Sequence, residues 1–182
     1  MSNATTVLLC GVGGQGTILA ADLLARTALA SNYDVKVSEI HGMSQRGGAV
    51  TTVVRFGTEP VATMVADHGC VDCVVSFETT EALRNLPFVR EGGYLLVADE
   101  DIKPLPVLTG KAGMPENARE KLQAAGASLI PAGPIAEQVA TAKSVNVVLL
   151  GALATRLDFS EEVWKEVISK RVPPKTVEAN LR

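Results

Sequence analysis

Residues 5–16 of the chain read TTVLLCGVGGQG, and residues 17–26 continue as TILAADLLAR. The first part contains an apolar run, VLLC at 7–10, that is typical of a buried strand, and the second part has its apolar residues at helical spacing. Gly11, Gly13 and Gly16 lie between the apolar run and the helical run, in the pattern Gly-x-Gly-x-x-Gly. The stretch therefore predicts a strand, a tight glycine turn and a helix, which together open a parallel α/β sheet.

The glycine turn is a candidate anion- or cofactor-binding loop, made of Gly11, Gly13, Gly14, Gln15 and Gly16. Glycines let the backbone approach a ligand closely, and the N–H groups at the start of a helix attract anions. Glu39 ends the next predicted strand, where an acid could bind a ribose. One interpretation is a free-standing nucleotide-binding oxidoreductase; the other is that the glycines serve packing alone. A P-loop is disfavoured because Thr17 stands where that motif needs a lysine.

A second glycine-rich segment follows the second predicted strand, which covers residues 35–40. In a parallel sheet both segments would leave the carboxyl ends of strands, where such sheets bind ligands. The Arg46 guanidinium can pair with a carboxylate or phosphate, and the His41 ring can titrate near neutrality or simply hold the loop. We expect an active-site edge or a subunit interface here, formed by Glu39, His41, Gly42, Met43, Ser44, Gln45, Arg46, Gly47 and Gly48.

The rest of the chain alternates between strand-like and helix-like segments, with Gly92-Gly93 as an expected turn and residues 103–115 as a surface excursion. This alternation predicts an α/β fold in three layers: a Rossmann-like, mostly parallel sheet with helices on both faces, in a single domain over residues 1–182. Further strands are expected at 49–56, 72–77, 94–98 and 127–130, and helices at 79–86, 116–125, 134–142, 144–157 and 160–171.

Three polar or aromatic residues outside the two segments are worth locating. Glu78 follows the strand at 72–77 and so lies at the same expected edge; it either contacts a ligand or Arg46, or supports the start of the next helix. Asn146 begins a nearly all-apolar helix and needs a partner, either the glycine loop or a backbone carbonyl. Trp164 lies on the apolar side of an amphipathic helix and is expected in the core.

Composition excludes several classes of protein. Hydrophobic residues make up 47% and charged residues 20% of the 182 residues, as in a globular domain. The net charge of −3 and the low aromatic content of 4% give no basis for nucleic-acid binding. No apolar stretch is long enough to span a membrane, and no basic region precedes the first apolar run. We therefore expect a cytoplasmic protein.

The three cysteines do not predict a metal centre. Cys70 and Cys73 have C-x-x-C spacing, but Cys73 opens a β-branched run that is typical of a buried strand. An iron–sulfur cluster normally takes four thiolates, one more than the chain contains. A zinc site that adds His41 and His68 is conceivable from the ligand types alone, yet the sparse set argues against it.

The two glycine segments together resemble the gamma subunit, or gamma domain, of the 2-oxoacid:ferredoxin oxidoreductases. The matching stretches are GVGGQG at 11–16 and EIHGMSQRGG at 39–48, with weaker matches at 72–84 and 146–153. This family includes pyruvate, ketoisovalerate, 2-oxoglutarate and indolepyruvate enzymes, and the chain is most similar to the indolepyruvate type. The resemblance covers nearly the whole chain, and the HGMSQRGG run is its specific part.

The resemblance implies oxidative decarboxylation of a 2-oxoacid, usually to an acyl-coenzyme A, with reduction of ferredoxin. The chain has no Gly-Asp-Gly motif for thiamine diphosphate, so the resemblance implies that this cofactor and the iron–sulfur clusters belong to partner subunits. It also implies that the chain is inactive alone, with both glycine loops facing the partner. A coenzyme A phosphate is a candidate ligand near residues 13–16. An alternative of another class is an interaction module whose glycine loops only pack.

Overall fold

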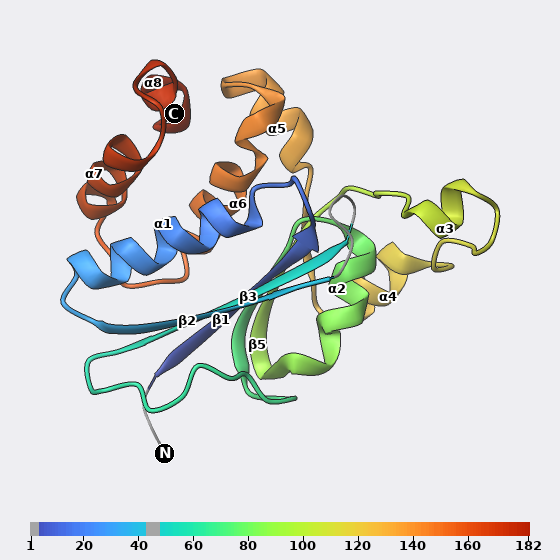
Figure 1. The fold of residues 1–182 in the computed structure, drawn as a ribbon, viewed down its shortest axis with the longest axis horizontal. Coiled ribbons are helices and arrows are strands. Elements are labelled where there is room, and N and C mark those ends of the chain that lie inside the picture. Colours follow the sequence, from blue (N-terminus) through green and yellow to red (C-terminus); the bar gives the residue numbers. More distant parts are fainter. Residues whose placement is uncertain (1–3, 43–47) are drawn as a thin grey trace.

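The computed structural model describes residues 4–42 and 48–182, with only the backbone of His41. Within them one sheet has the strand order β2-β3-β1-β4-β5-β6 (Figure 1). Strands β1, β4, β5 and β6 run parallel, whereas β3 is antiparallel to both neighbours, β1 and β2. The expected mostly parallel sheet is confirmed, with β3 as its exception. The strands are β1 Thr5–Val12, β2 Asp34–His41, β3 Ala49–Gly57, β4 Val71–Ser76, β5 Val89–Ala98 and β6 Ser128–Ile130.

Helices cover both faces of the sheet, as Figure 1 shows. Helices α1, α5, α6, α7 and α8 gather on one face and α2 and α4 on the other, while α3 lies on a projecting segment. The expected three layers are therefore present. The helices are α1 Thr17–Ala30, α2 Thr79–Asn85, α3 Leu105–Leu108, α4 Ala118–Ala124, α5 Ala132–Val139, α6 Val145–Ala154, α7 Glu161–Arg171 and α8 Val177–Asn180, with 3₁₀ turns at Leu86–Phe88, Ala142–Ser144 and Pro174–Thr176.

Strand β1 is apolar from Val7 to Cys10, where its side chains are buried on both faces of the sheet. Val7 and Leu9 belong to the core on the α1 side, and Leu8 and Cys10 belong to the core on the α2 side. Each such aliphatic side chain contributes about 1.5–3 kcal/mol when fully buried. Trp164 of α7 lies in the α1-side core, as expected. The layers on both faces thus fix β1 in the centre of the sheet.

The structure corrects one expected boundary. Gly92 and Gly93 lie inside β5, which starts at Val89, and do not form a turn before it. The pairing of β4 with β5 shifts register at this point, and Gly92 has a left-handed φ of 69°. A glycine inside a strand often marks such a bulge, because the extra residue needs a backbone conformation that other residues avoid. The glycine pair was a bulge signal rather than a turn signal.

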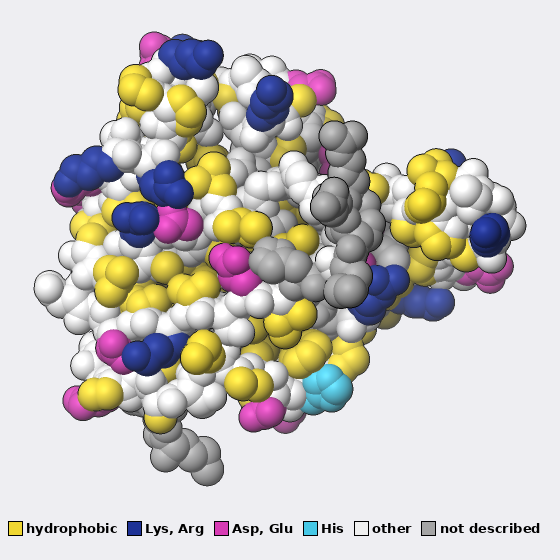
Figure 2. Space-filling view, in the orientation of Figure 1, with side chains coloured by type: hydrophobic (Ala, Val, Ile, Leu, Met, Phe, Trp, Pro, Cys, Tyr) yellow, Lys and Arg dark blue, Asp and Glu magenta, His cyan; other side chains and the backbone are white. Residues whose placement is uncertain are grey.

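The surface carries no dominant charge on the face shown in Figure 2. There the Lys and Arg side chains of the described residues are scattered among acidic and apolar ones. This distribution agrees with the net charge of −3 and lacks the basic stripe that nucleic-acid binding needs. Among the residues placed in the structure, no helix is both long enough and apolar enough to cross a membrane.

Candidate functional site

The loop between β1 and α1 is filled by the side chain of Gln15. Its Oε1 accepts a hydrogen bond of 2.8 Å from the Val12 N–H, and its Nε2 donates one of 2.8 Å to the Phe77 carbonyl. Gln15 therefore ties the ends of β1 and β4 together from inside the loop. An amide that satisfies two backbone groups leaves less room in the loop for a ligand's pyrophosphate.

The structure explains why the first and last positions of the glycine pattern, Gly11 and Gly16, are occupied by glycine. A Cβ on Gly11 would lie 2.7 Å from Gln15 Oε1 and 2.9 Å from the Phe77 Cβ, so Gly11 makes room for the Gln15 side chain. Gly16 precedes α1 with a left-handed φ of 82°, which glycine adopts without strain. A Cβ on Gly16 would also lie 3.0 Å from Asn146 Nδ2. Asn146, at the start of α6, thus packs against Gly16, and the hydrogen-bond partner expected for its side chain stays a prediction.

The two glycine segments meet, as their place in the sequence predicts. The Gly13 N–H donates a hydrogen bond of 2.9 Å to the Gly48 carbonyl, and the Gly42 N–H donates one of 2.8 Å to the Ala49 carbonyl. The first bond extends the pairing of β1 with β3 beyond Val12, which lies opposite Ala49, and the second extends the pairing of β2 with β3 beyond residue 41. The end of the second segment is therefore fixed beside the first loop, and Gly42 near its start is fixed to the beginning of β3.

Glu39 does not lie on the strand next to β1. It is an exposed residue of β2 and pairs with Thr52 of β3, so β3 separates it from the glycine loop. In the dinucleotide-binding fold, the acidic residue lies on the strand directly beside β1. This order of strands, with Gln15 inside the loop, argues against the nucleotide-binding alternative. The side chain of His41 and the candidates Met43, Ser44, Gln45, Arg46 and Gly47 lie outside the described residues.

Glu78 lies at the expected edge, where it caps helix α2. Its carboxylate accepts a hydrogen bond of 3.0 Å from the Thr80 N–H and another from the Glu81 N–H. The residue is 1% exposed, and Ser76 Oγ donates a bond of 2.7 Å to its carbonyl. Glu78 therefore supports the start of helix α2, as one of the two interpretations expected, and its pairing with Arg46 stays a prediction. A buried carboxylate held by backbone donors is fixed in place.

Glu81 brings a second carboxylate close to Glu78. Burial raises the pKa of the Glu81 carboxyl, and the negative charge of Glu78 raises it further. The Arg84 guanidinium, 2.7 Å from the Glu81 carboxylate, lowers that pKa and so opposes the rise. The nearby Cys10 thiol is fully buried, which raises its pKa to about 12 despite a hydrogen bond with Ser76. The α2 side of this edge is thus acidic and poorly solvated.

A polar cluster at the end of β5 was missed from the sequence. Thr79 Oγ1 donates a hydrogen bond to Asp101, and Arg119 binds Asp101 at 2.7 Å and Asp99 at 2.5 Å. The Thr79 hydroxyl and the Arg119 guanidinium lower the pKa of Asp101. Thr79, Asp101 and Arg119 line a hollow of about 300 Å³ together with Lys103. The signal was the acidic run from Asp99 to Asp101 directly after a predicted strand.

The cysteines are in the positions that their neighbours predict. Cys73 lies on β4, where burial raises its thiol pKa to about 11, while Cys70 is exposed. In the described parts of the chain, no three His, Cys, Asp or Glu side chains are grouped as metal ligands would be. The expectation that the chain holds no metal stays a prediction.

Comparison with known proteins decides the family. The family model described as pyruvate ferredoxin/flavodoxin oxidoreductase matches residues 6–182. The chain belongs to this oxidoreductase family. This family member is 40% identical to the indolepyruvate oxidoreductase subunit IorB of Thermococcus kodakarensis, over 97% of its length and 90% of that protein's. It is 39% identical to IorB of Pyrococcus horikoshii, with the same coverage.

A solved structure has the same fold as this oxidoreductase-family chain. The gamma subunit of a keto/oxoacid ferredoxin oxidoreductase from Geobacter sulfurreducens PCA superposes with a TM-score of 0.71, at 23% identity. The match covers 97% of this family member and 92% of that subunit. Together with the sequence matches, this favours the gamma-type subunit over the free-standing nucleotide-binding enzyme.

Proposed function

We propose that this chain is the gamma-type subunit of a 2-oxoacid:ferredoxin oxidoreductase that acts on indolepyruvate or a similar aromatic 2-oxoacid. The observation that carries the proposal is the family match over residues 6–182, joined to the 40% identity with an indolepyruvate oxidoreductase subunit. The reaction would be oxidative decarboxylation of the 2-oxoacid, usually to an acyl-coenzyme A, with electrons passed to ferredoxin.

Partner subunits would carry thiamine diphosphate and the iron–sulfur clusters. The cysteine chemistry of this chain supports the second part, since a cluster normally takes four thiolates and the chain has three. Two of these three, Cys10 and Cys73, are buried in the sheet. By this proposal the chain is inactive alone and works in the cytoplasm, and the cofactor-bearing chemistry takes place on its partners.

The edge formed by the two glycine segments would face those partners. The Gly13–Gly48 hydrogen bond joins the two segments at one end of the sheet, and the Gln15 side chain holds the first of them. Helix α1 starts there without a side-chain cap, and uncapped N–H groups favour an anion. If coenzyme A contacts this chain, we therefore place its phosphate beside residues 13–16.

Anaerobic affinity purification of the tagged chain from its native cell tests the proposal. We expect a brown complex that contains thiamine diphosphate and iron, and that reduces ferredoxin faster with indolepyruvate than with pyruvate or 2-oxoglutarate. A colourless chain that purifies without partners and binds NAD would contradict the proposal. It would favour the nucleotide-binding enzyme despite the strand order.

An Arg46→Ala variant, with exposed Lys175→Ala as its charge-matched control, separates the roles of the second segment. Normal assembly with slower turnover would assign Arg46 to the active-site edge. Failed assembly would assign it to the subunit interface. If both variants match the wild type in assembly and turnover, Arg46 has neither role.

A further inference from the structure

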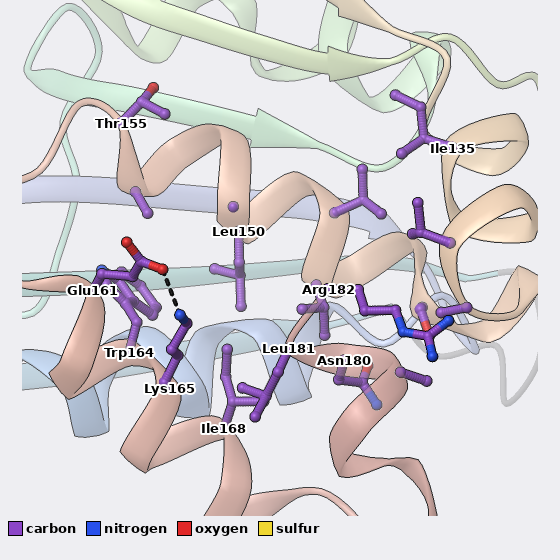
Figure 3. A pocket seen from close by; sticks show the side chains of 18 of the residues that line it. Ile135, Leu150, Thr155, Glu161, Trp164, Lys165, Ile168, Asn180, Leu181 and Arg182 are labelled. Atoms are coloured by element: carbon purple, nitrogen blue, oxygen red, sulfur yellow. Dashed lines mark ion pairs between the residues drawn. The ribbon is translucent and has the colours of Figure 1, made fainter.

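A cavity lies among the C-terminal helices of the described residues. It measures about 560 Å³ and is lined by residues of α5, α6 and α7 and by the last residues of the chain (Figure 3). Leu150, Ile168 and Leu181 point into its middle, and Glu161, Lys165 and Arg182 lie towards its ends. An apolar pocket of this size is the usual form of a small-molecule site.

Helix α6 is unusual for a helix with an open side. Its sequence VNVVLLGALA has no charged residue, and its one strongly polar side chain, Asn146, is buried against the glycine loop. Leu149 and Leu153 pack into the core, whereas Val147, Val148 and Gly151 line the cavity. A helix that is apolar all round is normally buried on all sides. In the described part of the chain, the outer side of α6 therefore borders the cavity instead of being fully covered by packed side chains.

Gly151 gives a separate indication that something occupies the cavity. A glycine inside a helix costs about 0.5–1 kcal/mol relative to alanine. Gly151 is exposed, and a Cβ built on it would have no atom within 4 Å. No contact within the described chain therefore requires glycine at this position. The missing side chain leaves room for a molecule that lies against the α6 backbone.

Charge and size together define the occupant. The three charged residues that line the cavity already have partners in the chain: Lys165 binds Glu161 at 2.6 Å, and Arg182 binds Glu178 at 2.7 Å. An ionic ligand would find each of these three described side chains already paired, whereas an uncharged ligand needs no charged partner. A helix of 10 Å diameter fills about 400 Å³ per turn of 5.4 Å. The cavity thus holds little more than one turn, which favours a small molecule over a partner's helix.

We propose that this cavity binds a small uncharged apolar molecule, aromatic or branched-aliphatic, or the uncharged apolar part of a larger ligand. The molecule lies between α6 and α7, against Gly151 and the aliphatic side chains around it. This inference does not rest on the proposed function, because its test uses the purified 182-residue chain alone.

Trp164 makes the test direct, because it lines the cavity and is the chain's only tryptophan. Titration with the neutral dye N-phenyl-1-naphthylamine should quench Trp164 fluorescence to saturation. Gly151→Leu places a side chain in the cavity and should weaken binding by about tenfold or more. Gly151→Ala is the matched control: it gains the same helix propensity, leaves most of the cavity open and should bind nearly as the wild type does.

Melting curves check that the Gly151→Leu and Gly151→Ala variants are folded. Both variants should unfold in one transition, with a melting temperature at or above that of the wild type. No saturable quenching in the wild type would overturn the proposal, as would unchanged binding in a folded Gly151→Leu variant. If the anionic dye 1-anilinonaphthalene-8-sulfonate binds at least tenfold more tightly than N-phenyl-1-naphthylamine, the proposal that the ligand is uncharged would be overturned. A wild-type dimer that Gly151→Leu makes monomeric would also overturn it, since a second copy would then fill the cavity.

Discussion

The backbone N–H of Gly13 donates a hydrogen bond of 2.9 Å to the carbonyl oxygen of Gly48. This bond joins the loop after β1 to the segment before β3, so the two glycine segments form one edge of the molecule. It extends the antiparallel pairing of β1 with β3, in which Val12 lies opposite Ala49. The loop after β1 therefore anchors the end of the second segment through Gly13, and Gln15 ties that loop to the ends of β1 and β4.

Loss of the Gln15 side chain should destabilise the protein. Gln15→Ala removes the acceptor for the Val12 N–H and the donor for the Phe77 carbonyl. Two partly buried backbone groups would lose their partners, which costs about 1–3 kcal/mol for each group that stays dry. Urea unfolding measures the change. Gln123→Ala, at an exposed position of α4, is the control, and equal stability of the two variants would contradict the role of Gln15.

A methyl group at Gly11 should disturb the same contacts. In Gly11→Ala the new Cβ would lie 2.7 Å from Gln15 Oε1 and 2.9 Å from the Phe77 Cβ, so both side chains must move. Overpacking of this kind typically costs about 1–3 kcal/mol. Gly113→Ala is the matched control because its Cβ meets no atom within 4 Å. Thermal unfolding should separate the two variants, and an unchanged melting temperature in Gly11→Ala would show that the loop is not packed as described.

Replacement of Glu81 by glutamine should change how stability depends on pH. Burial raises the pKa of Glu81 above its ordinary value of 4.5, and so does the charge of Glu78. The folded state then binds the proton more readily than the unfolded state, so the charged form opposes folding above the folded pKa. This penalty disappears as pH falls through the folded pKa towards 4.5.

Glu81→Gln should therefore be more stable than the wild type at pH 7, and the difference should shrink on acidification. Melting temperatures measured from pH 7 to pH 4 give both curves. Glu120→Gln, which replaces an exposed carboxylate, should follow the wild type over the whole range. A wild-type advantage at pH 7 would mean that the ion pair with Arg84 outweighs the burial of the charge.

The three cysteines should differ in their reaction with iodoacetamide. Burial raises the thiol pKa of Cys10 to about 12 and that of Cys73 to about 11. At pH 8 a thiol of pKa 12 is a thiolate in about one molecule in ten thousand, and only the thiolate reacts. We expect mass spectrometry to find a single modification at exposed Cys70 in the folded chain and three modifications in urea. Rapid native labelling of Cys73 would instead indicate an accessible C-x-x-C pair.

Much of the fold could be predicted because its signals are local. The apolar run of β1, the helical spacing after Gly16 and the β-branched runs of β3 and β4 each reflect the burial of neighbouring residues. The error at Gly92-Gly93 has a physical reason as well. A glycine with positive φ serves a turn and a bulge equally, and only the shifted pairing of β4 with β5 distinguishes them.

The sequence by itself determined the alternation of strands and helices, the edge shared by two glycine segments and the family, since these depend on local patterns. The tertiary structure decided the place of β3 between β1 and β2, which separates Glu39 from the glycine loop. It also decided that Gln15 fills that loop, that Glu78 caps α2 and that Gly151 faces a cavity. Strand order and side-chain partners arise from contacts between segments far apart in the chain, which no local pattern records.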